Sequence, residues 1–141
     1  MRSFGIVGGM TITTEVDTRG ADTLSTKKLG NLGEDIAADI LARAGYEILE
    51  RNFRTRHGEI DIVALDGDTL VFIEVKTRRS LVMGSAVEAV DSRKVRKLRT
   101  MIGAYFLERS PQHSGVRLDA FGVFVMPGGH VDVTHLKAVG S

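Results

Sequence analysis

Four charged residues interrupt two consecutive segments that are otherwise typical of buried strands. The stretch reads GEIDIVALDGDTLVFIEVKTR over residues 58–78, and its valines, isoleucines and phenylalanine favour β-structure. Charged side chains are costly inside a sheet unless they meet water or a partner. We therefore ask whether these residues face solvent or converge on a ligand: Glu59, Asp61, Glu74 and Lys76.

Strand alternation predicts where the first pair of carboxylates points. Alternate side chains of a strand share a face of the sheet. We therefore expect Glu59 and Asp61 to point the same way, with Ile60 and Ile62 together on the opposite face. Asp66-Gly67 is a hairpin signal, because a tight turn needs a residue that tolerates positive φ.

The hairpin brings a second carboxylate toward Asp61. Glu74 and Lys76 share one face of the returning segment, and Glu74 can lie beside Asp61 across the sheet. Two close carboxylates are tolerated if water screens them, if one is protonated, or if a cation binds. Oxygen ligands suit Mg²⁺ or Mn²⁺, with the Val75 backbone carbonyl as a further ligand. Lys76 could orient a water molecule or stabilise charge on a phosphate. The alternative is the solvated charged face of an ordinary hairpin.

Hydrophobic spacing predicts the elements that position these residues. From about Thr26, Leu32, Ile36 and Ile40 recur at helical spacing, and Gly45 is placed to end the helix. A second helix is predicted over residues 86–109. Strands are predicted over 46–53, 59–66, 69–78 and 116–126, with another within 128–139. This order predicts an α/β domain whose mixed β-sheet is flanked by helices.

Composition limits the class of protein. The chain has 141 residues, 43% of them hydrophobic, and a formal net charge of +1. It contains no cysteine, which excludes disulfides and thiolate metal sites. No apolar run is long enough to span a membrane and no signal peptide is evident, so we expect a cytoplasmic protein without membrane contact. Residues 1–24 lack a sustained period and predict a flexible extension or a vector-derived remnant, ahead of a single domain over 25–141.

The motif resembles that of a known nuclease superfamily. GEID, followed by EVK with Glu74 thirteen positions after Asp61, resembles the core of the PD-(D/E)xK nucleases. Ile60 stands where that pattern has proline. The span 33–136 is similar to the YraN-like family of small bacterial proteins (UPF0102 type), which resemble archaeal Holliday-junction resolvases. The similar pieces are LGEDIAADILARAGYEILERNFR, GEIDIVALDGDTLVFIEVKTR, VEAVDSRKVRKLRTMIGAYFL and VRLDAFGV.

The resemblance implies a restriction-endonuclease-like fold and an Mg²⁺- or Mn²⁺-dependent endonuclease. It implies Asp61 and Glu74 as metal ligands and Lys76 as the catalytic lysine. Glu34 matches a glutamate that resolvase-like members carry on the first helix, so it is expected among the catalytic and metal-binding residues. The alternative for Glu34 is an ordinary exposed glutamate near a helix N-terminus, where the helix dipole favours it.

Two further acidic residues have open roles. Glu59 is a metal ligand, a partner of a ligand, or one half of an ion pair with a neighbouring arginine. Asp119 resembles a family position on a later strand, and its alternative role is to stabilise a neighbouring arginine.

Basic residues cluster around the motif. Eleven of the nineteen lysines and arginines lie in three short runs, and local positive charge of this kind binds nucleic-acid phosphates. We expect DNA as the partner, branched or flapped, with a homodimer suited to paired cuts. The alternatives are a nucleic-acid-binding module without catalysis and an interaction domain with a solvated charged face. Besides Lys76, the residues expected to contact nucleic acid are Arg51, Arg54, Arg56, Arg78, Arg79, Arg93, Lys94, Arg96, Lys97 and Arg99.

Overall fold

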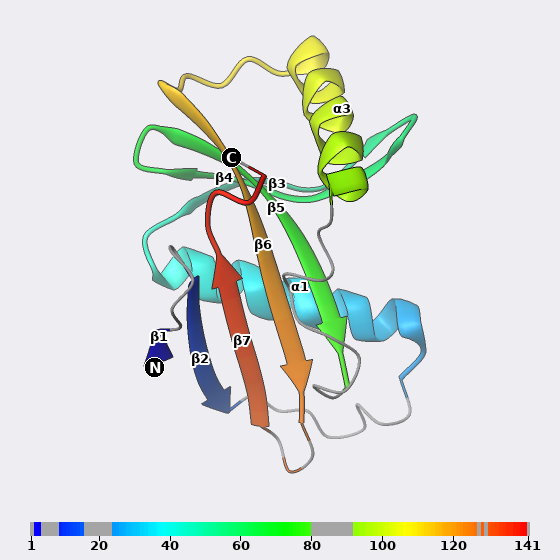
Figure 1. The fold of residues 1–141 in the computed structure, drawn as a ribbon, viewed down its shortest axis with the longest axis vertical. Helices are drawn as coiled ribbons and strands as arrows, with labels where there is room; N and C mark the ends of the chain where they lie inside the picture. The colour runs from blue at the N-terminus through cyan, green and yellow to red at the C-terminus, as the bar shows by residue number, and fades with distance from the viewer. Residues whose placement is uncertain are drawn as a thin grey trace.

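The described residues form one mixed β-sheet with a helix on each face. The computed structural model describes residues 2–3, 9–15, 24–79, 92–126, 128 and 130–140. The seven strands lie in the order β1-β2-β7-β6-β5-β4-β3 (Figure 1). Among the described strands, β5 and β6 pair in parallel and the other neighbours pair antiparallel. The elements are β1 (Arg2–Ser3), β2 (Gly9–Glu15), α1 (Thr26–Arg43), β3 (Glu47–Thr55), β4 (Gly58–Asp66), β5 (Thr69–Arg78), α3 (Ser92–Glu108), β6 (Gly115–Val125) and β7 (His130–Leu136).

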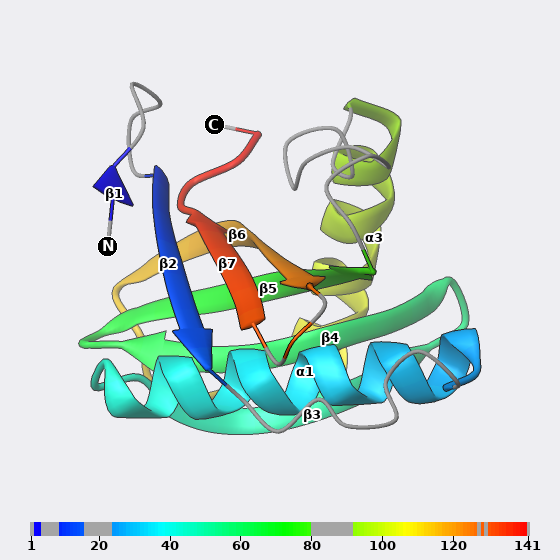
Figure 2. The same cartoon turned by 90° about the horizontal axis from the view of Figure 1, so that it is seen from below.

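Two hydrophobic clusters attach the helices to opposite faces of the sheet. Ile36 and Leu41 of α1 pack with Ile73 of β5. Tyr105 of α3 packs with Phe72, the neighbour of Ile73 in β5, on the other face. Figure 2 shows α1 running along one side of the sheet and α3 on the other, and it shows how far the strand direction turns from β2 to β3. This arrangement confirms the expected α/β fold with a restriction-endonuclease-like core.

The sequence signals for the end of the first helix and for the hairpin turn are confirmed. Helix α1 ends at Arg43, and Gly45 follows with φ of 98°, a conformation that glycine adopts without strain. Strands β4 and β5 pair as far as Asp66 and Thr69, so a two-residue loop joins them. Gly67 in this loop has φ of 63°. The loop therefore fixes the register that carries Asp61 toward β5.

The N-terminal region and the second helix differ from the sequence expectations. Residues 9–15 form β2, which pairs with β7 along its whole length, so part of the expected flexible extension is a strand of the sheet. The β-branched run Thr11–Thr14 favours this. Helix α3 is described from Ser92, and the earlier part of its predicted range lies outside the described residues. Within the described part of the chain, neither helix has the length and apolarity to cross a membrane.

Gly33 allows α1 to approach β5 closely. A Cβ atom at this position would lie 1.8 Å from Oγ1 of Thr77 and 2.8 Å from its Cβ, so any side chain forces the two elements apart. Glu34 is the next residue of the helix. The close approach therefore sets the height of Glu34 above the sheet.

We expect Gly33→Ala to lower the free energy of unfolding by about 1–3 kcal/mol, because the added methyl group overpacks the contact with Thr77. The matched control is Gly30→Ala on the same helix, where a Cβ would meet nothing within 4 Å. That change should stabilise the protein by about 0.5–1 kcal/mol through helix propensity. Urea unfolding of both variants measures the difference, and equal effects at the two positions would contradict the close approach.

Candidate metal centre

Strand β4 changes face at Asp61. Ile60 packs in the cluster under α3, whereas Ile62 packs in the cluster under α1. Residues two apart on a regular strand share a face. The expectation that Ile60 and Ile62 lie together opposite Asp61 is therefore wrong, because the strand turns between them. The neighbouring strand is irregular at the same level, where Asn52 of β3 has φ of 55°.

The Asp61 carboxylate fills the gap where β4 and β5 separate. The backbone pairing of these strands ends at Ile62 and Ile73. Beyond that point Val75 N–H donates to Oδ2 of Asp61, at 2.8 Å, instead of to a β4 carbonyl. The N–H and C=O of one strand residue point to the same side. The Val75 carbonyl, a predicted metal ligand, therefore faces the same gap.

The environment of Asp61 disfavours its charged form. Burial is the largest cause, followed by repulsion from Glu74 and, more weakly, from Glu34. The hydrogen bond from Val75 N–H opposes these effects without cancelling them. Together they raise the pKa of Asp61 to about 8. The predicted proximity of Asp61 and Glu74 is confirmed, and the pair holds a proton at neutral pH when no cation is bound.

Glu74 lies on the α3 side of the sheet and is largely buried. Ile73 and Val75 pack toward α1, so strand alternation confirms the opposite orientation for Glu74. Its side chain is 12% exposed, and Oε1 lies 3.0 Å from Nζ of Lys94, which α3 supplies. Lys76 lies two residues further along β5 and is exposed. The predicted catalytic lysine and a second lysine are therefore both near Glu74.

Glu34 approaches Asp61 from the α1 side. Its side chain is 13% exposed, so the alternative of an ordinary exposed glutamate is wrong. Its Oε1 atom is buried and has no hydrogen-bond partner, and Nη2 of Arg51 lies 3.8 Å away. Burial raises the pKa of Glu34, while Arg51 and a hydrogen bond from the Asn52 side chain lower it. A buried carboxylate oxygen without a hydrogen bond is costly and is free to accept a cation.

The donor atoms suit a hard divalent cation. Asp61 and Glu74 form a close pair, Glu34 is near enough to raise the pKa of Asp61, and the Val75 carbonyl faces the same gap. Carboxylate and carbonyl oxygens are the ligands of Mg²⁺ and Mn²⁺. Within the described ranges, no three acidic or histidine side chains are already close enough to hold one ion. The residues are therefore of the types that bind such a cation, and Asp61 and Glu74 are the two that already lie close together.

Glu59 and several of the basic residues have protein partners. Glu59 forms an ion pair with Arg54, at 3.5 Å, which is one of the three roles expected for it. Arg51 pairs with Asp35 at 2.7 Å, beside its longer contact to Glu34. Arg79 and Arg99 donate to the backbone carbonyls of Leu24 and Gly140, respectively.

The remaining basic residues form a positive surface on α3, the β3–β4 turn and the end of β5. The β3–β4 turn packs against α3, since a Cβ at Gly58 would lie 3.2 Å from Sδ of Met101 and 3.7 Å from Nζ of Lys97. Two of the three basic runs therefore meet on one side of the sheet. Arg56, Arg93, Arg96 and Lys97 are exposed, and Arg78 is half-buried.

Sequence reasoning missed the contributions of Asn52 and Lys94. Asn52 was not considered, although asparagine is unusual within a strand and is among the few residues that tolerate the left-handed conformation. Lys94 was expected to contact nucleic acid, whereas the structure pairs it with Glu74. This contact could not be foreseen, because it depends on how α3 packs against β5.

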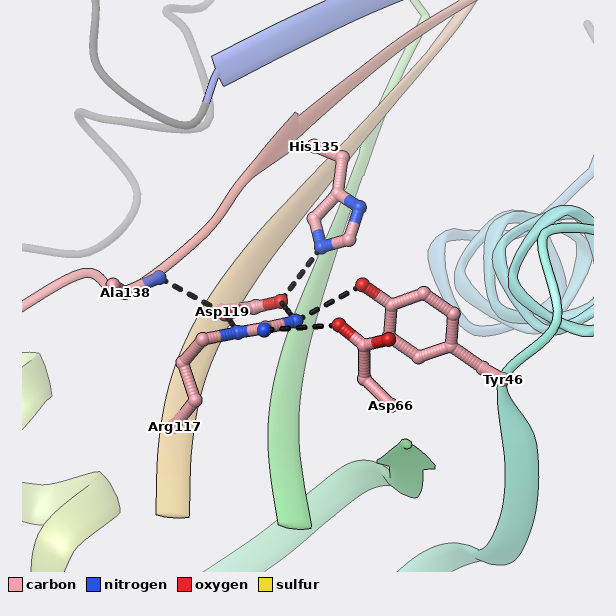
Figure 3. A network of polar contacts seen from close by, with 6 residues as sticks. All are labelled: Tyr46, Asp66, Arg117, Asp119, His135 and Ala138. Carbon is pink, nitrogen blue, oxygen red and sulfur yellow. Dashed lines mark hydrogen bonds and ion pairs between the residues drawn. The ribbon is translucent and has the colours of Figure 1, made fainter. Parts of the chain in front are cut away.

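A separate buried network surrounds Asp119 (Figure 3). Both oxygens of this fully buried carboxylate accept hydrogen bonds from Arg117, at 2.9 and 3.0 Å. His135 and the Ala138 N–H also bond to it, at 2.8 and 3.0 Å. Burial alone would raise the pKa of Asp119, but the bonds from His135 and Arg117 lower it. The alternative in which Asp119 stabilises an arginine is confirmed.

We expect the metal-free protein to lose stability as the pH rises from about 4 to about 8. The pKa of Asp61 is raised in the folded state, so this group's contribution is complete below its unfolded pKa of 3.8 and is lost through the folded value of about 8. If the pair were fully buried, a pKa raised from 3.8 to about 8 would correspond to a larger loss of unfolding free energy. Because solvent reaches part of the pair and screens it, the loss should amount to roughly 2–4 kcal/mol. Urea unfolding in EDTA measures it. The difference between wild type and Asp61→Asn isolates this group, and a pH-independent difference would contradict the raised pKa.

Comparison with known proteins identifies the family. The model of the uncharacterised protein family UPF0102 matches residues 33–123, which include Glu34, Asp61, Glu74 and Lys94. A UPF0102 protein of Rhodococcus opacus (strain B4) is 43% identical over 109 residues, covering 77% of this chain and 92% of that protein. One from Mycobacterium tuberculosis is 41% identical over 123 residues, covering 84% and 96%. The YraN-like resemblance is thereby confirmed, and the chain belongs to the UPF0102 family.

Proposed function

We propose that this protein is a divalent-cation-dependent endonuclease that hydrolyses DNA phosphodiesters, with branched or flapped DNA as the substrate. The observation that carries the proposal is the Asp61–Glu74 pair in the gap between β4 and β5. A close, buried pair of carboxylates costs stability in the metal-free protein. Such a cost is common where a site is kept for function.

Asp61, Glu74 and the Val75 carbonyl would hold Mg²⁺ or Mn²⁺, with Glu34 as the additional carboxylate from α1. When bound, the cation supplies a lowered pKa for a coordinated water and stabilises charge on the phosphate oxygens. The Oε1 atom of Glu34 supports this assignment, because a buried carboxylate oxygen normally accepts a hydrogen bond and this one has none.

Lys76 is the residue proposed to orient the attacking water and to stabilise the phosphate. It is exposed and lies two residues beyond Glu74 on β5, so strand alternation places it on the same face. Hydrolysis joins the water oxygen to phosphorus and breaks one phosphorus–oxygen bond of the DNA backbone. One proton leaves the water, and the departing oxygen gains one. An ammonium group near the phosphate favours this charge development.

The positive surface supports a polyanionic substrate. The acidic pair alone would repel DNA, whereas the exposed Arg56, Arg93, Arg96 and Lys97 can neutralise phosphates beside it. Binding should accordingly weaken steeply with salt. Paired cuts in a branched substrate need two sites, and a homodimer of this chain would supply them.

A non-catalytic nucleic-acid-binding module is the second candidate. The observation that favours it is that the described residues hold no group of three close ligands in the metal-free state. Such a module would keep the positive surface and salt-sensitive binding without hydrolysis.

The test is cleavage of labelled DNA by the purified protein in Mg²⁺ or Mn²⁺. The panel contains a four-way junction, a flap, a linear duplex and a single strand, with Lys76→Ala as the matched variant. Cleavage by the wild type that Lys76→Ala loses would support the nuclease, and the preferred DNA would identify the substrate. Salt-sensitive binding of the same DNA without cleavage in either cation would favour the binding module.

A further inference from the structure

We propose that Lys94 serves as the counter-cation of the metal centre while no divalent cation is bound. Its ammonium group forms an ion pair with Glu74 until a divalent cation binds, and it then contacts a substrate phosphate. This inference rests on the proposed function. It assigns to Lys94 a positioning role that differs from general nucleic-acid binding, since the lysine competes with the metal for one carboxylate.

The contact between Lys94 and Glu74 carries the inference. Nζ lies 3.0 Å from Oε1, which is the distance of a charge-assisted hydrogen bond. The Glu74 side chain is 12% exposed, whereas that of Lys94 is 36% exposed. The carboxylate is therefore fixed in the site, and the ammonium group reaches it from the solvent side. A half-exposed lysine on a flexible stem can leave without disturbing the core.

The place of Lys94 in its helix argues against a purely structural role. It lies in the first turn of α3 as described from Ser92, and the described residues of that turn include no acidic side chain. The positive end of the helix dipole disfavours cations in that turn and favours carboxylates. The ion pair with Glu74, at 3.0 Å, offsets this cost. The same dipole would support an anion, such as a phosphate, once Lys94 turns away from Glu74.

The electrostatics of the Asp61–Glu74 pair complete the argument. Two acidic side chains in one gap need positive charge, and the ammonium of Lys94, 3.0 Å from Oε1 of Glu74, supplies part of it. A bound divalent cation would supply this positive charge in place of Lys94. The released ammonium could then contact a substrate phosphate, where it would add to the positive charge of Lys76.

The experiment measures Mn²⁺ affinity by calorimetry for the wild type, Lys94→Met, Lys94→Arg and Lys97→Met. Methionine keeps an unbranched side chain of similar length and helix propensity without the charge. Lys94→Met should bind Mn²⁺ about tenfold more tightly, since the cation no longer displaces a charge-assisted bond. Lys94→Arg should stay within about threefold of the wild type, because it keeps the competing charge. Lys97→Met removes the same charge one turn away and should also stay within about threefold.

A second experiment measures the DNA affinity of the same proteins in Ca²⁺ and in EDTA. Calcium is a hard oxygen-seeking cation that fills such sites, so it should strengthen DNA binding of the wild type. Ca²⁺ should strengthen DNA binding by Lys94→Met about fivefold less than it strengthens binding by the wild type, because no ammonium is released toward the phosphate. Lys97→Met should lose the same factor of DNA affinity in Ca²⁺ and in EDTA.

The outcomes separate this inference from the proposed function. Wild-type Mn²⁺ binding with Lys94→Met unchanged would overturn the role of Lys94 and leave the metal centre intact. Equal gains for Lys94→Met and Lys97→Met would also overturn it, because only the overall charge would then matter. No Mn²⁺ binding by any of the four proteins would overturn both proposals.

Discussion

Asp61→Asn is expected to abolish DNA hydrolysis, with a loss of at least about 1,000-fold in Mg²⁺. Asparagine keeps the shape of the side chain and can still accept the Val75 N–H, so the fold should survive. It removes one negative charge from the pair that would hold the cation. Because metal-assisted charge stabilisation is worth several kcal/mol in the transition state, a loss of about 4 kcal/mol corresponds to this factor.

The same substitution should stabilise the metal-free protein. At pH 8 it removes the repulsion between Asp61 and Glu74 and the cost of burying the charge, so the unfolding midpoint should rise. A variant that is more stable yet inactive is the signature of a site kept at the expense of stability. Asp35→Asn is the control: it removes an exposed carboxylate of α1 and should retain activity within about threefold. Unreduced cleavage by Asp61→Asn would contradict the assignment.

Asp119→Ala is expected to cause the largest loss of stability, about 3–5 kcal/mol. The change leaves Arg117 with Asp66 as its remaining carboxylate, at 3.0 Å. It also removes the acceptor for His135 and for the Ala138 N–H. Removing one partner of a buried ion pair leaves the other charge short of compensation, and here Asp66 alone would remain to offset Arg117. The melting temperature should fall by on the order of 10 °C.

The control for this prediction is Asp39→Ala. Asp39 pairs with Arg43 on the exposed surface of α1, at 3.1 Å, and its side chain is 57% exposed. Such a surface pair contributes about 0–1 kcal/mol. Thermal unfolding of both variants, followed by circular dichroism, measures the contrast. Similar losses at the two positions would mean that the network around Asp119 does not stabilise the fold as described.

Much of the fold follows from local signals in the sequence. The apolar spacing of α1, the glycine that ends it and the two-residue turn after Asp66 all act over a few residues, so their outcomes can be predicted. The strand character of residues 9–15 was missed, because its pairing partner β7 lies more than a hundred residues away. The β-branched run Thr11–Thr14 favours a strand, but no nearby residue shows which strand it pairs with.

The candidate site was predictable in its residues and less so in its geometry. The spacing of Asp61 and Glu74 on a hairpin was sufficient to expect their proximity. The turn of β4 at Asp61 was not predictable, since it depends on Asn52 in the neighbouring strand and on packing against both helices. The contact of Lys94 with Glu74 depends on how α3 docks, which no spacing within the helix encodes.

The most direct test of the metal centre is the anomalous scattering of Mn²⁺ in crystals of this protein. The structure predicts a single strong anomalous peak within bonding distance of Asp61 and Glu74, with Lys94 moved away from Glu74. The Asp61→Asn protein, treated in the same way, should show no peak there. A peak elsewhere, or none at saturating Mn²⁺ while Lys94 still contacts Glu74, would contradict the assignment of these carboxylates as a metal centre.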